Sequence, residues 1–326
     1  MFYIYFGFRA MKKLLLILMI FPIVSFNKIS LNNNIILLSD PTVLEDKGKY
    51  YLYGTRSGGS DKTNDGFLVY ESTNLIDWEA KGYALKKGDA YGNKGFWSPQ
   101  VFKNGEFYVM AYTANEKIAI ASSKSPLGPF KNSSKTYFKS DFKEIDPYIF
   151  FDNGKIYLYR VRRIDKTNQI YVSELNKNLS IKKNNTPSKC FIKYQSWEDQ
   201  ENIGIGSNQG PSVIKIGGVY YMFYSANSFR STRYAVGYAK SPTPIGPWVK
   251  SKNNPIIDFS KINQNGPGHG DIFYDHQEKS YKYVLHTHFS KNRLRPRKTG
   301  ILNLVHLIKS NEIAIRPETF KFLKSQ

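Results

Sequence analysis

Two Asp-Pro pairs, Asp40-Pro41 and Asp146-Pro147, occupy the same point of a repeated sequence pattern. Two carboxyl groups that face one cavity can cleave a glycosidic bond, because one protonates the leaving oxygen while the other activates water. A carboxyl group near a second acid has a raised pKa, which suits the acid role. A single Asp-Pro pair is also a common turn signal, so it is the repetition that favours a functional site.

The elements that must position these residues are predicted by the repeat itself. In each copy an apolar strand follows the pair, then a polar turn and a strand rich in Tyr and Phe. The copies are anchored by five prolines spaced 48 to 64 residues apart, namely Pro41, Pro99, Pro147, Pro211 and Pro267. A repeat of about 50 residues built from short strands is typical of a propeller blade. We therefore predict an all-β fold, a single five-bladed β-propeller over residues 27–326.

The start of each inner strand lies at one end of a propeller's central tunnel. The residues at these starts are Asp40, Trp97-Ser98, Asp146, Gln209 and Gly268-His269. Convergent polar groups beside an aromatic wall are typical of a sugar site. We expect Phe96 and Trp97 to stack on a sugar ring, with Asn208 and His269 as polar contacts. For Phe96 and Trp97, packing in the core at a blade junction is the alternative.

Three histidines raise the question of a metal. His286 and His288 lie two residues apart on a predicted strand, so their side chains share a face and could form a cluster with His269. The spacing does not match that of a catalytic zinc site. Asp271 could instead support a hard cation through oxygen. We expect that no cofactor is required.

The chain of 326 residues carries a formal net charge of +21 and is 15% aromatic. Such a charge is typical of proteins that bind nucleic acid, anionic lipid or a uronate-bearing glycan. However, the lysines are scattered and no nucleic-acid module is visible, so we favour a compositional bias and expect no nucleic-acid partner. The basic run from Arg293 to Lys298 reads as a solvated loop. The one cysteine, Cys190, excludes an intrachain disulfide, and we expect it to be buried.

Residues 1–26 read as a signal peptide, with translation starting at Met1 or at Met11. Lys12 and Lys13 precede the apolar run LLLILMIFPIV, which is short for a membrane span and contains Pro22. We therefore expect a secreted or periplasmic protein without stable membrane insertion. An uncleaved membrane anchor is the alternative.

Five motifs together carry a resemblance to a known family: SDPTV with YYLYGT, FWSPQVFKNGEFY, EIDPYIFFDNGKIYLY, GPSVIKIGGVYYMFYSAN, and GPGHGD with VLHTH. Over residues 36–290 the chain resembles glycoside hydrolase family 43. The resemblance implies a five-bladed propeller that removes terminal α-L-arabinofuranosyl or β-D-xylosyl residues from polysaccharides with inversion. It implies that Asp40 is the general base and that Asp146 tunes the pKa of the general acid. It also places His269 near the tunnel axis, as the candidate ligand of a structural Ca²⁺ ion.

The sequence departs from the family at one position. The family's general acid is the Glu of a Glu-Gly-Pro motif, and Gln209 stands there, in Asn208-Gln209-Gly210-Pro211. An amide cannot donate a proton to a departing alkoxide at ordinary pH. A carboxyl on the preceding loop could replace the acid, with Glu198, Asp199 and Glu201 as candidates.

Alternatively, the leaving group needs little protonation, or the protein is a non-catalytic glycan-binding propeller. A propeller that only makes protein contacts is a third class, and a filled tunnel would favour it.

Overall fold

The computed structural model describes residues 1–2, 34–56, 65–165, 167–183, 186–191, 195–199 and 207–326. The chain divides into two units, Met1–Asn33 and Asn34–Gln326, and the fold below is that of the second. The signal-peptide prediction for residues 1–26, with its alternative start at Met11, falls outside the described residues except for residues 1–2. None of the described helices has the length and hydropathy to cross a membrane.

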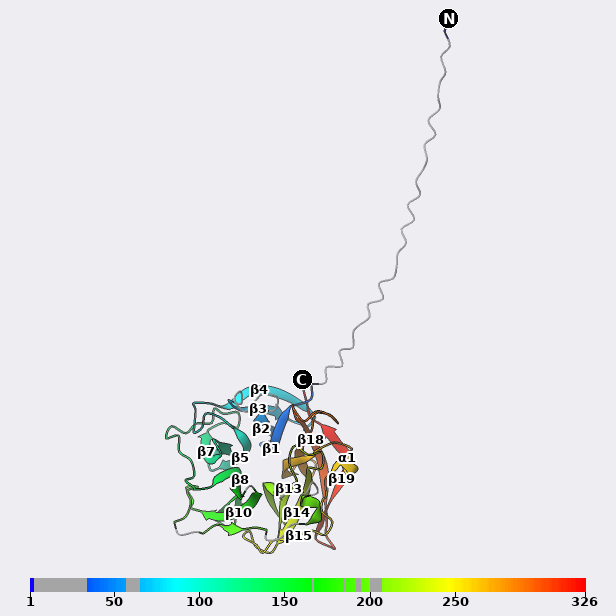
Figure 1. The fold of residues 1–326 in the computed structure, drawn as a ribbon. Coiled ribbons are helices and arrows are strands. Elements are labelled where there is room, and N and C mark those ends of the chain that lie inside the picture. The colour runs from blue at the N-terminus through cyan, green and yellow to red at the C-terminus, as the bar shows by residue number, and fades with distance from the viewer. Residues whose placement is uncertain (3–33, 57–64, 166, 184–185, 192–194, 200–206) are drawn as a thin grey trace. The chain divides into compact units, whose positions relative to one another are not determined.

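Five sheets follow one another around a central axis, which confirms the predicted five-bladed β-propeller (Figure 1). The first blade contains β1 (Leu38–Asp46), β2 (Lys49–Arg56), β3 (Gly66–Ser72) and β4 (Asp77–Lys86). The second contains β5 (Trp97–Asn104), β6 (Phe107–Ala114) and β7 (Lys117–Ser123). The third contains β8 (Lys143–Asp152), β9 (Lys155–Ile164), β10 (Thr167–Leu175) and β11 (Ser188–Lys189).

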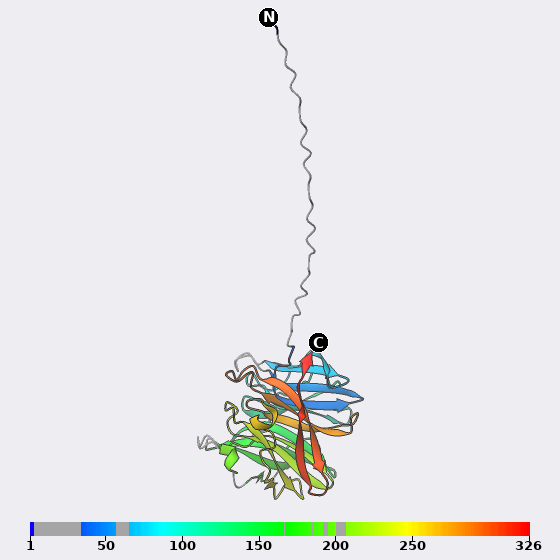
Figure 2. The same ribbon diagram turned by 90° about the vertical axis from the view of Figure 1, so that its right-hand side faces the viewer.

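The fourth blade contains β12 (Gln209–Ile216), β13 (Val219–Ala226), β14 (Ala235–Ser241) and β15 (Val249–Lys250). The fifth contains β16 (Gly268–Asp275), β17 (Ser280–Thr287), β18 (Lys298–Leu307) and β19 (Glu312–Phe322). Two short helices, η1 (Ser196–Asp199) and α1 (Phe259–Ile262), lie in connections. The last strand, β20 (Lys324–Ser325), pairs in parallel with β4, so the end of the chain completes the first blade (Figure 2).

The second strand of each blade forms the core, because neighbouring blades cover both of its faces. In β13, seven of the eight residues of VYYMFYSA are buried, and β6 shows the same pattern. Aromatic rings pack across the junctions, as between Phe223 of the fourth blade and Tyr283 of the fifth, whose centroids are 5.4 Å apart. Cys190 is buried, as expected.

A bulge at the same place in every first strand explains why the repeated residues converge. The register shifts between Ser39 and Thr42, and at the equivalent point of the other four blades. The residue at each bulge has a left-handed φ: Asp40 50°, Ser98 46°, Asp146 54°, Gly210 61° and His269 36°. Such a bulge bends the strand and re-aims the side chain, here toward the axis.

Hydrogen bonds join the bulges of neighbouring blades into a ring. Four of the five bulge N–H groups donate to a side chain on the second strand of the preceding blade: Ser98 to Thr55 (2.9 Å), Asp146 to Thr113 (3.0 Å), His269 to Ser225 (2.7 Å) and Asp40 to His286 (3.1 Å). At the remaining junction, between the third and fourth blades, the equivalent residue is Val161, whose side chain cannot accept a hydrogen bond. There the N–H of Gly210 donates to Oδ2 of Asp146 instead (3.2 Å).

Candidate functional site

A cavity of about 360 Å³ lies at the ring of bulges and is lined by residues of all five blades. It brings together five residues that the sequence predicted for the site: Asp40, Trp97, Asp146, Gln209 and His269. Trp97 is half-buried, so part of its ring faces the cavity. An open cavity lined by carboxylates differs from the filled tunnel that a purely structural propeller would have.

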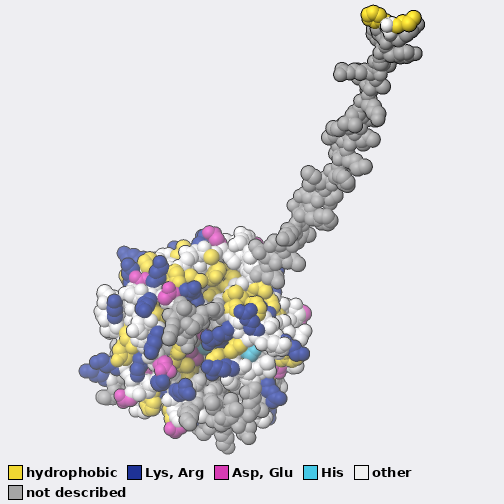
Figure 3. Space-filling view, turned by 45° about the horizontal axis from the view of Figure 1, so that its top comes forward, with side chains coloured by type: hydrophobic (Ala, Val, Ile, Leu, Met, Phe, Trp, Pro, Cys, Tyr) yellow, Lys and Arg dark blue, Asp and Glu magenta, His cyan; other side chains and the backbone are white. Residues whose placement is uncertain are grey.

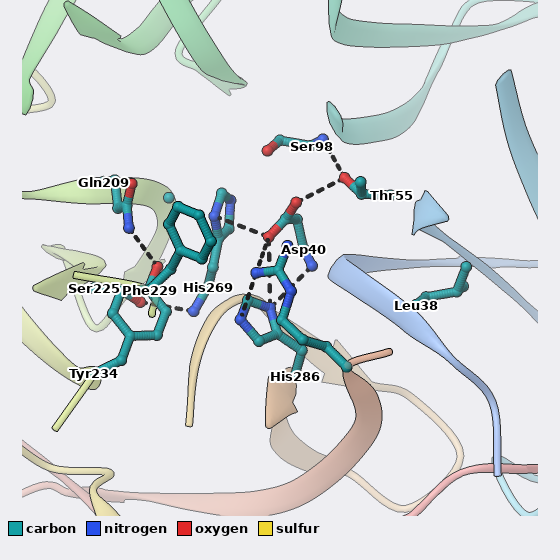
Figure 4. Close-up of polar contacts among 12 residues, drawn as sticks. Leu38, Asp40, Thr55, Ser98, Gln209, Ser225, Phe229, Tyr234, His269 and His286 are labelled. Atoms are coloured by element: carbon teal, nitrogen blue, oxygen red, sulfur yellow. Dashed lines mark hydrogen bonds and ion pairs between the residues drawn. The ribbon is translucent and has the colours of Figure 1, made fainter. Parts of the chain in front are cut away.

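Asp40 is held as a carboxylate. Its Oδ2 accepts a hydrogen bond from Thr55 (2.7 Å), while its Oδ1 lies 3.3 Å from Nδ1 of His269 and 3.5 Å from Nη1 of Arg297 (Figure 4). Burial raises the pKa of Asp40, but His269, Arg297 and the Thr55 hydroxyl outweigh burial and hold the pKa below its ordinary value of 3.8. Asp40 is therefore ionised at neutral pH and able to accept a proton.

Asp146 shifts in the opposite direction. Its Oδ1 accepts from Ser98 Oγ (2.8 Å), and its Oδ2 lies 4.0 Å from Nδ1 of His269. Burial and the nearby charge of Asp40 raise the pKa of Asp146, against the lowering effects of His269 and the hydrogen bonds. One cavity thus holds two carboxyl groups whose environments separate their pKa values, as in many acid–base sites.

Gln209 makes one hydrogen bond at each end of its amide. Its Oε1 accepts from Nδ2 of Asn168 (3.2 Å) and its Nε2 donates to the hydroxyl of Tyr234 (2.9 Å). Burial raises the pKa of Tyr234 well above its ordinary value, so its hydroxyl stays protonated. Both neighbours can donate a hydrogen bond, so they would accommodate a carboxylate at this position as readily as the amide.

Phe96 does not contribute to the cavity, contrary to the expectation that it stacks on a sugar. Its ring is fully buried between the first two blades, against Phe67 (5.9 Å between centroids) and Tyr112 (6.2 Å). Adjacent residues at the start of a strand point to opposite sides, so Trp97 faces the cavity while Phe96 faces the core. Asn208 is buried as well, and it is not among the described residues that line the cavity.

The expectation that Glu198 reaches the cavity rim is contradicted. Glu198 lies on η1, is fully buried, and pairs with Nζ of Lys250 (2.7 Å) and the hydroxyl of Tyr224 (2.6 Å). Asp199 does not line the cavity either, and Glu201 falls outside the described residues. Among the described residues, the third carboxyl that lines the cavity is Glu116, which the sequence analysis missed and which pairs with Lys143 (2.6 Å).

Arg297 is the other residue that the sequence analysis missed, since the run from Arg293 to Lys298 was expected to be a solvated loop. Its side chain is buried against Asp40 and the ring of Phe229, and its Nη1 lies 2.9 Å from Nε2 of His286. No local signal marks this arginine, because its carboxylate partner, Asp40, lies 257 residues away in the chain.

The three histidines do not form a metal cluster. His286 is enclosed by the N–H of Asp40 and by Arg297, and Nε2 of His288 lies 3.0 Å from the carbonyl of Phe229. Among the described residues, no group of three His, Cys, Asp or Glu side chains is placed to hold a metal ion.

The residues near His269 also offer Ca²⁺ few free oxygens. With His269, Asp271 lines a cavity of about 20 Å³ at the bulges, but its two oxygens already accept from Thr42 and Ser212. A hard cation needs several oxygen ligands, so the described residues fit Ca²⁺ poorly. A Ca²⁺ ion at His269 stays a prediction, and no step below depends on it.

Comparison with known proteins links this geometry to one group of enzymes. The model of the family described as Glycosyl hydrolases family 43 matches residues 33–305. A crystal structure described as an endo-1,4-β-xylanase from Bacteroides thetaiotaomicron is 35% identical, with a TM-score of 0.82 over 90% of this chain and 99% of that chain.

Two relatives match with lower identity. A non-reducing end α-L-arabinofuranosidase of Bacteroides ovatus, BoGH43B, is 25% identical over 224 residues, which cover 63% of this chain and 37% of the relative. An extracellular exo-α-(1→5)-L-arabinofuranosidase of Streptomyces avermitilis is 25% identical over 209 residues, which cover 58% and 42%. The chain therefore spans less than half the length of these two relatives.

Proposed function

The chain belongs to glycosyl hydrolases family 43, and on that premise we propose that it removes terminal α-L-arabinofuranosyl or β-D-xylosyl residues from polysaccharides with inversion. The observation that carries the proposal is the ionised Asp40 in an open cavity, beside Asp146 with its raised pKa. Two arabinofuranosidases among the relatives favour the arabinofuranoside class.

In the proposed reaction Asp40 is the general base. It takes a proton from a water molecule as that water attacks the anomeric carbon, and the bond to the leaving oxygen breaks. Thr55, His269 and Arg297 hold the carboxylate in place. Asp146 supports the electrostatics of the cavity without touching the transferred proton.

The leaving oxygen must be protonated in another way, because Gln209 has no acidic proton. One hydrogen of its Nε2 is donated to Tyr234. The other can stabilise the negative charge on the leaving oxygen, which then takes its proton from solvent. Hydrolysis is then fast for aryl glycosides with good leaving groups and slow for natural linkages.

The second candidate is a propeller that binds the same terminal sugars without cleaving them. The hydrogen bonds of Gln209 with Asn168 and Tyr234 favour this candidate, because both the oxygen and the nitrogen of the amide have a partner without a carboxyl at this position. The retained charges on Asp40 and Asp146 then serve only to bind sugar hydroxyls.

One experiment separates the two candidates. The wild-type protein and the variants Asp40→Asn and Glu116→Gln are assayed with 4-nitrophenyl α-L-arabinofuranoside, 4-nitrophenyl β-D-xyloside and the matching oligosaccharides. NMR of the first product identifies its anomer, and calorimetry measures binding. Asp40-dependent hydrolysis that gives the inverted anomer supports the enzyme, whereas binding without hydrolysis of any substrate supports the second candidate. Unchanged hydrolysis by Asp40→Asn would refute the assigned base.

We also propose that the protein acts outside the cytoplasm, in the secreted or periplasmic fraction. This location is supported by the apolar run after Met11 and by the similarity to the Streptomyces relative, which is described as extracellular. Cell fractionation with N-terminal sequencing of the mature protein tests it, and a full-length protein in the cytoplasm would overturn it.

A further inference from the structure

The cavity is lined by an unusual set of cations. Among the described residues, six Lys and Arg side chains line it against three Asp and Glu, and five of the six are arginines: Arg56, Arg163, Arg230, Arg295 and Arg297. Arg297 is buried against Asp40, whereas Arg163 and Arg230 are exposed and Arg295 is partly exposed. Most of these arginines therefore lie where a ligand would enter the cavity, and are not buried against Asp40 as Arg297 is.

A general excess of basic residues does not explain this set. The chain contains 36 lysines and 11 arginines, and Lys and Arg side chains are spread over the surface (Figure 3). Of those that the structure describes, five arginines but only one lysine, Lys143, line the cavity. A compositional bias would have placed mostly lysines there. Arginine is the side chain that binds carboxylate and sulfate groups through two parallel hydrogen bonds.

Two of the cations lie directly opposite one another. Lys143 on β8 and Arg163 on β9 are register partners, an arrangement that costs stability when both carry the same charge. Lys143 is paired with Glu116, whereas Arg163 contacts no carboxylate of the described residues. An anion bound beside Arg163 would relieve this repulsion.

The cations of the later blades are oriented by an aromatic ring and by Asp40. The guanidinium of Arg230 lies over the ring of Phe229 at 4.7 Å from its centroid, and that of Arg297 lies 5.4 Å from the same centroid. Stacking restricts a guanidinium before any ligand binds, which lowers the entropic cost of binding. Arg295 is close enough to Asp40 to lower its pKa, so it lies near the reacting centre.

We propose that the cavity accepts a glycan that carries a negative group, a uronate carboxylate or a sulfate ester, on the sugar next to the terminal one. Arg163, Arg230 and Arg295 bind that group. The terminal arabinose or xylose is itself uncharged, so the anion must belong to the neighbouring sugar. This inference rests on the proposed function, because it takes the cavity to be the glycan site.

The test compares three arabino- or xylo-oligosaccharides of equal length: a neutral one, one with a uronate on the second sugar, and one with a sulfate there. Calorimetry at 50 mM and 500 mM NaCl measures binding to wild type, Arg163→Gln, Arg295→Gln and the control Arg316→Gln, whose exposed arginine does not line the cavity. We expect wild type to bind the anionic glycans about tenfold more tightly than the neutral one at low salt. The preference should shrink at high salt and in both cavity variants, but not in Arg316→Gln.

The outcomes distinguish failure of this inference from failure of the proposed function. Equal binding of neutral and anionic glycans overturns the inference and leaves the proposed function standing. A charge preference without hydrolysis of any of the three keeps the inference and overturns the enzymatic proposal. Preference for uronate alone, or for sulfate alone, identifies the source of the anion. Equally tight binding of a single-stranded oligonucleotide, or no glycan binding at all, overturns the inference.

Discussion

The backbone N–H of Asp40 in the first blade donates to Nδ1 of His286 in the last, over 3.1 Å. On its other side, Nε2 of His286 faces Nη1 of Arg297 at 2.9 Å. A backbone N–H can only donate, so Nδ1 must accept and carry no hydrogen, whereas a charged imidazolium carries a hydrogen on both ring nitrogens. The histidine that closes the ring of blades must stay uncharged.

This arrangement predicts that the propeller loses stability as the solution becomes acidic. Burial, and then the charge of Arg297, hold the pKa of His286 well below its ordinary 6.5. The unfolded chain therefore binds a proton near pH 6.5 that the folded chain refuses, so this contribution is present above that pH and is lost as pH falls. The free energy of unfolding should drop by up to about 1.4 kcal/mol per pH unit below 6.5.

Urea titrations of wild type and His286→Asn between pH 5 and 8 measure this slope. The variant should show a shallower slope, while His276→Asn, a control at an exposed histidine, should follow wild type. Equal slopes in wild type and His286→Asn would contradict the prediction.

Replacement of the proposed base should stop hydrolysis without unfolding the protein. Asp40→Asn keeps the bond from Thr55 but cannot take a proton from water, so kcat should fall at least about 100-fold. Azide, which attacks without a base, should restore part of the turnover. Loss of activity with no rescue by azide, together with a lowered melting temperature, would point to a purely structural role for Asp40.

Gln209→Glu should install an acid in a site that already fits one. The hydroxyl of Tyr234 and the amide of Asn168 can both donate to the new carboxyl group. We expect hydrolysis of natural oligosaccharides to rise about 100-fold or more, with a new fall in rate at high pH as the acid ionises. Aryl substrates with good leaving groups should change little. Gln277→Glu, at an exposed residue, is the control, and equal gains on both substrate types would argue against an acid role.

The contribution of the ring of hydrogen bonds to stability can be tested at a junction that has the side-chain acceptor, Thr55, and at the junction that lacks it, Val161. The Thr55 hydroxyl accepts from the buried N–H of Ser98 and donates to Asp40, so Thr55→Val should cost about 1–3 kcal/mol of stability. Val161→Thr adds a hydroxyl at the one junction that lacks it and should cost little or nothing. Denaturant unfolding of both variants provides the comparison, and a larger loss in Val161→Thr than in Thr55→Val would refute the ring as a source of stability.

Glu198 should matter for stability rather than for catalysis. Glu198→Gln removes the negative charge that pairs with Nζ of Lys250 in a buried ion pair, which should cost about 3–5 kcal/mol, while kcat on an aryl glycoside stays unchanged for the folded protein. The double variant Glu198→Gln, Lys250→Met should recover much of the lost stability. A selective loss of kcat with normal stability would restore Glu198 as a candidate acid.

The repeat explains how much of this molecule could be predicted from its sequence. Asp40, Asp146 and His269 occupy one recurring position, so predicting the blades also predicted that these side chains converge. Phe96 and Trp97 were harder, because strand alternation places adjacent side chains on opposite faces but does not tell which of the two faces the cavity. Arg297 could not be found, because its burial depends on a contact with Asp40, 257 residues away, that no local pattern reveals.

That separation along the chain has a consequence for how the protein is made. Of the groups that hold Asp40, Thr55 is 15 residues away, but His286 and Arg297 follow 246 and 257 residues later. During synthesis the first four blades can emerge and collapse while the reacting centre remains unassembled. Contacts between such distant residues also form slowly, since a long loop must close first. A nascent or C-terminally truncated chain is therefore expected to be inert toward sugars until the fifth blade has folded against the first.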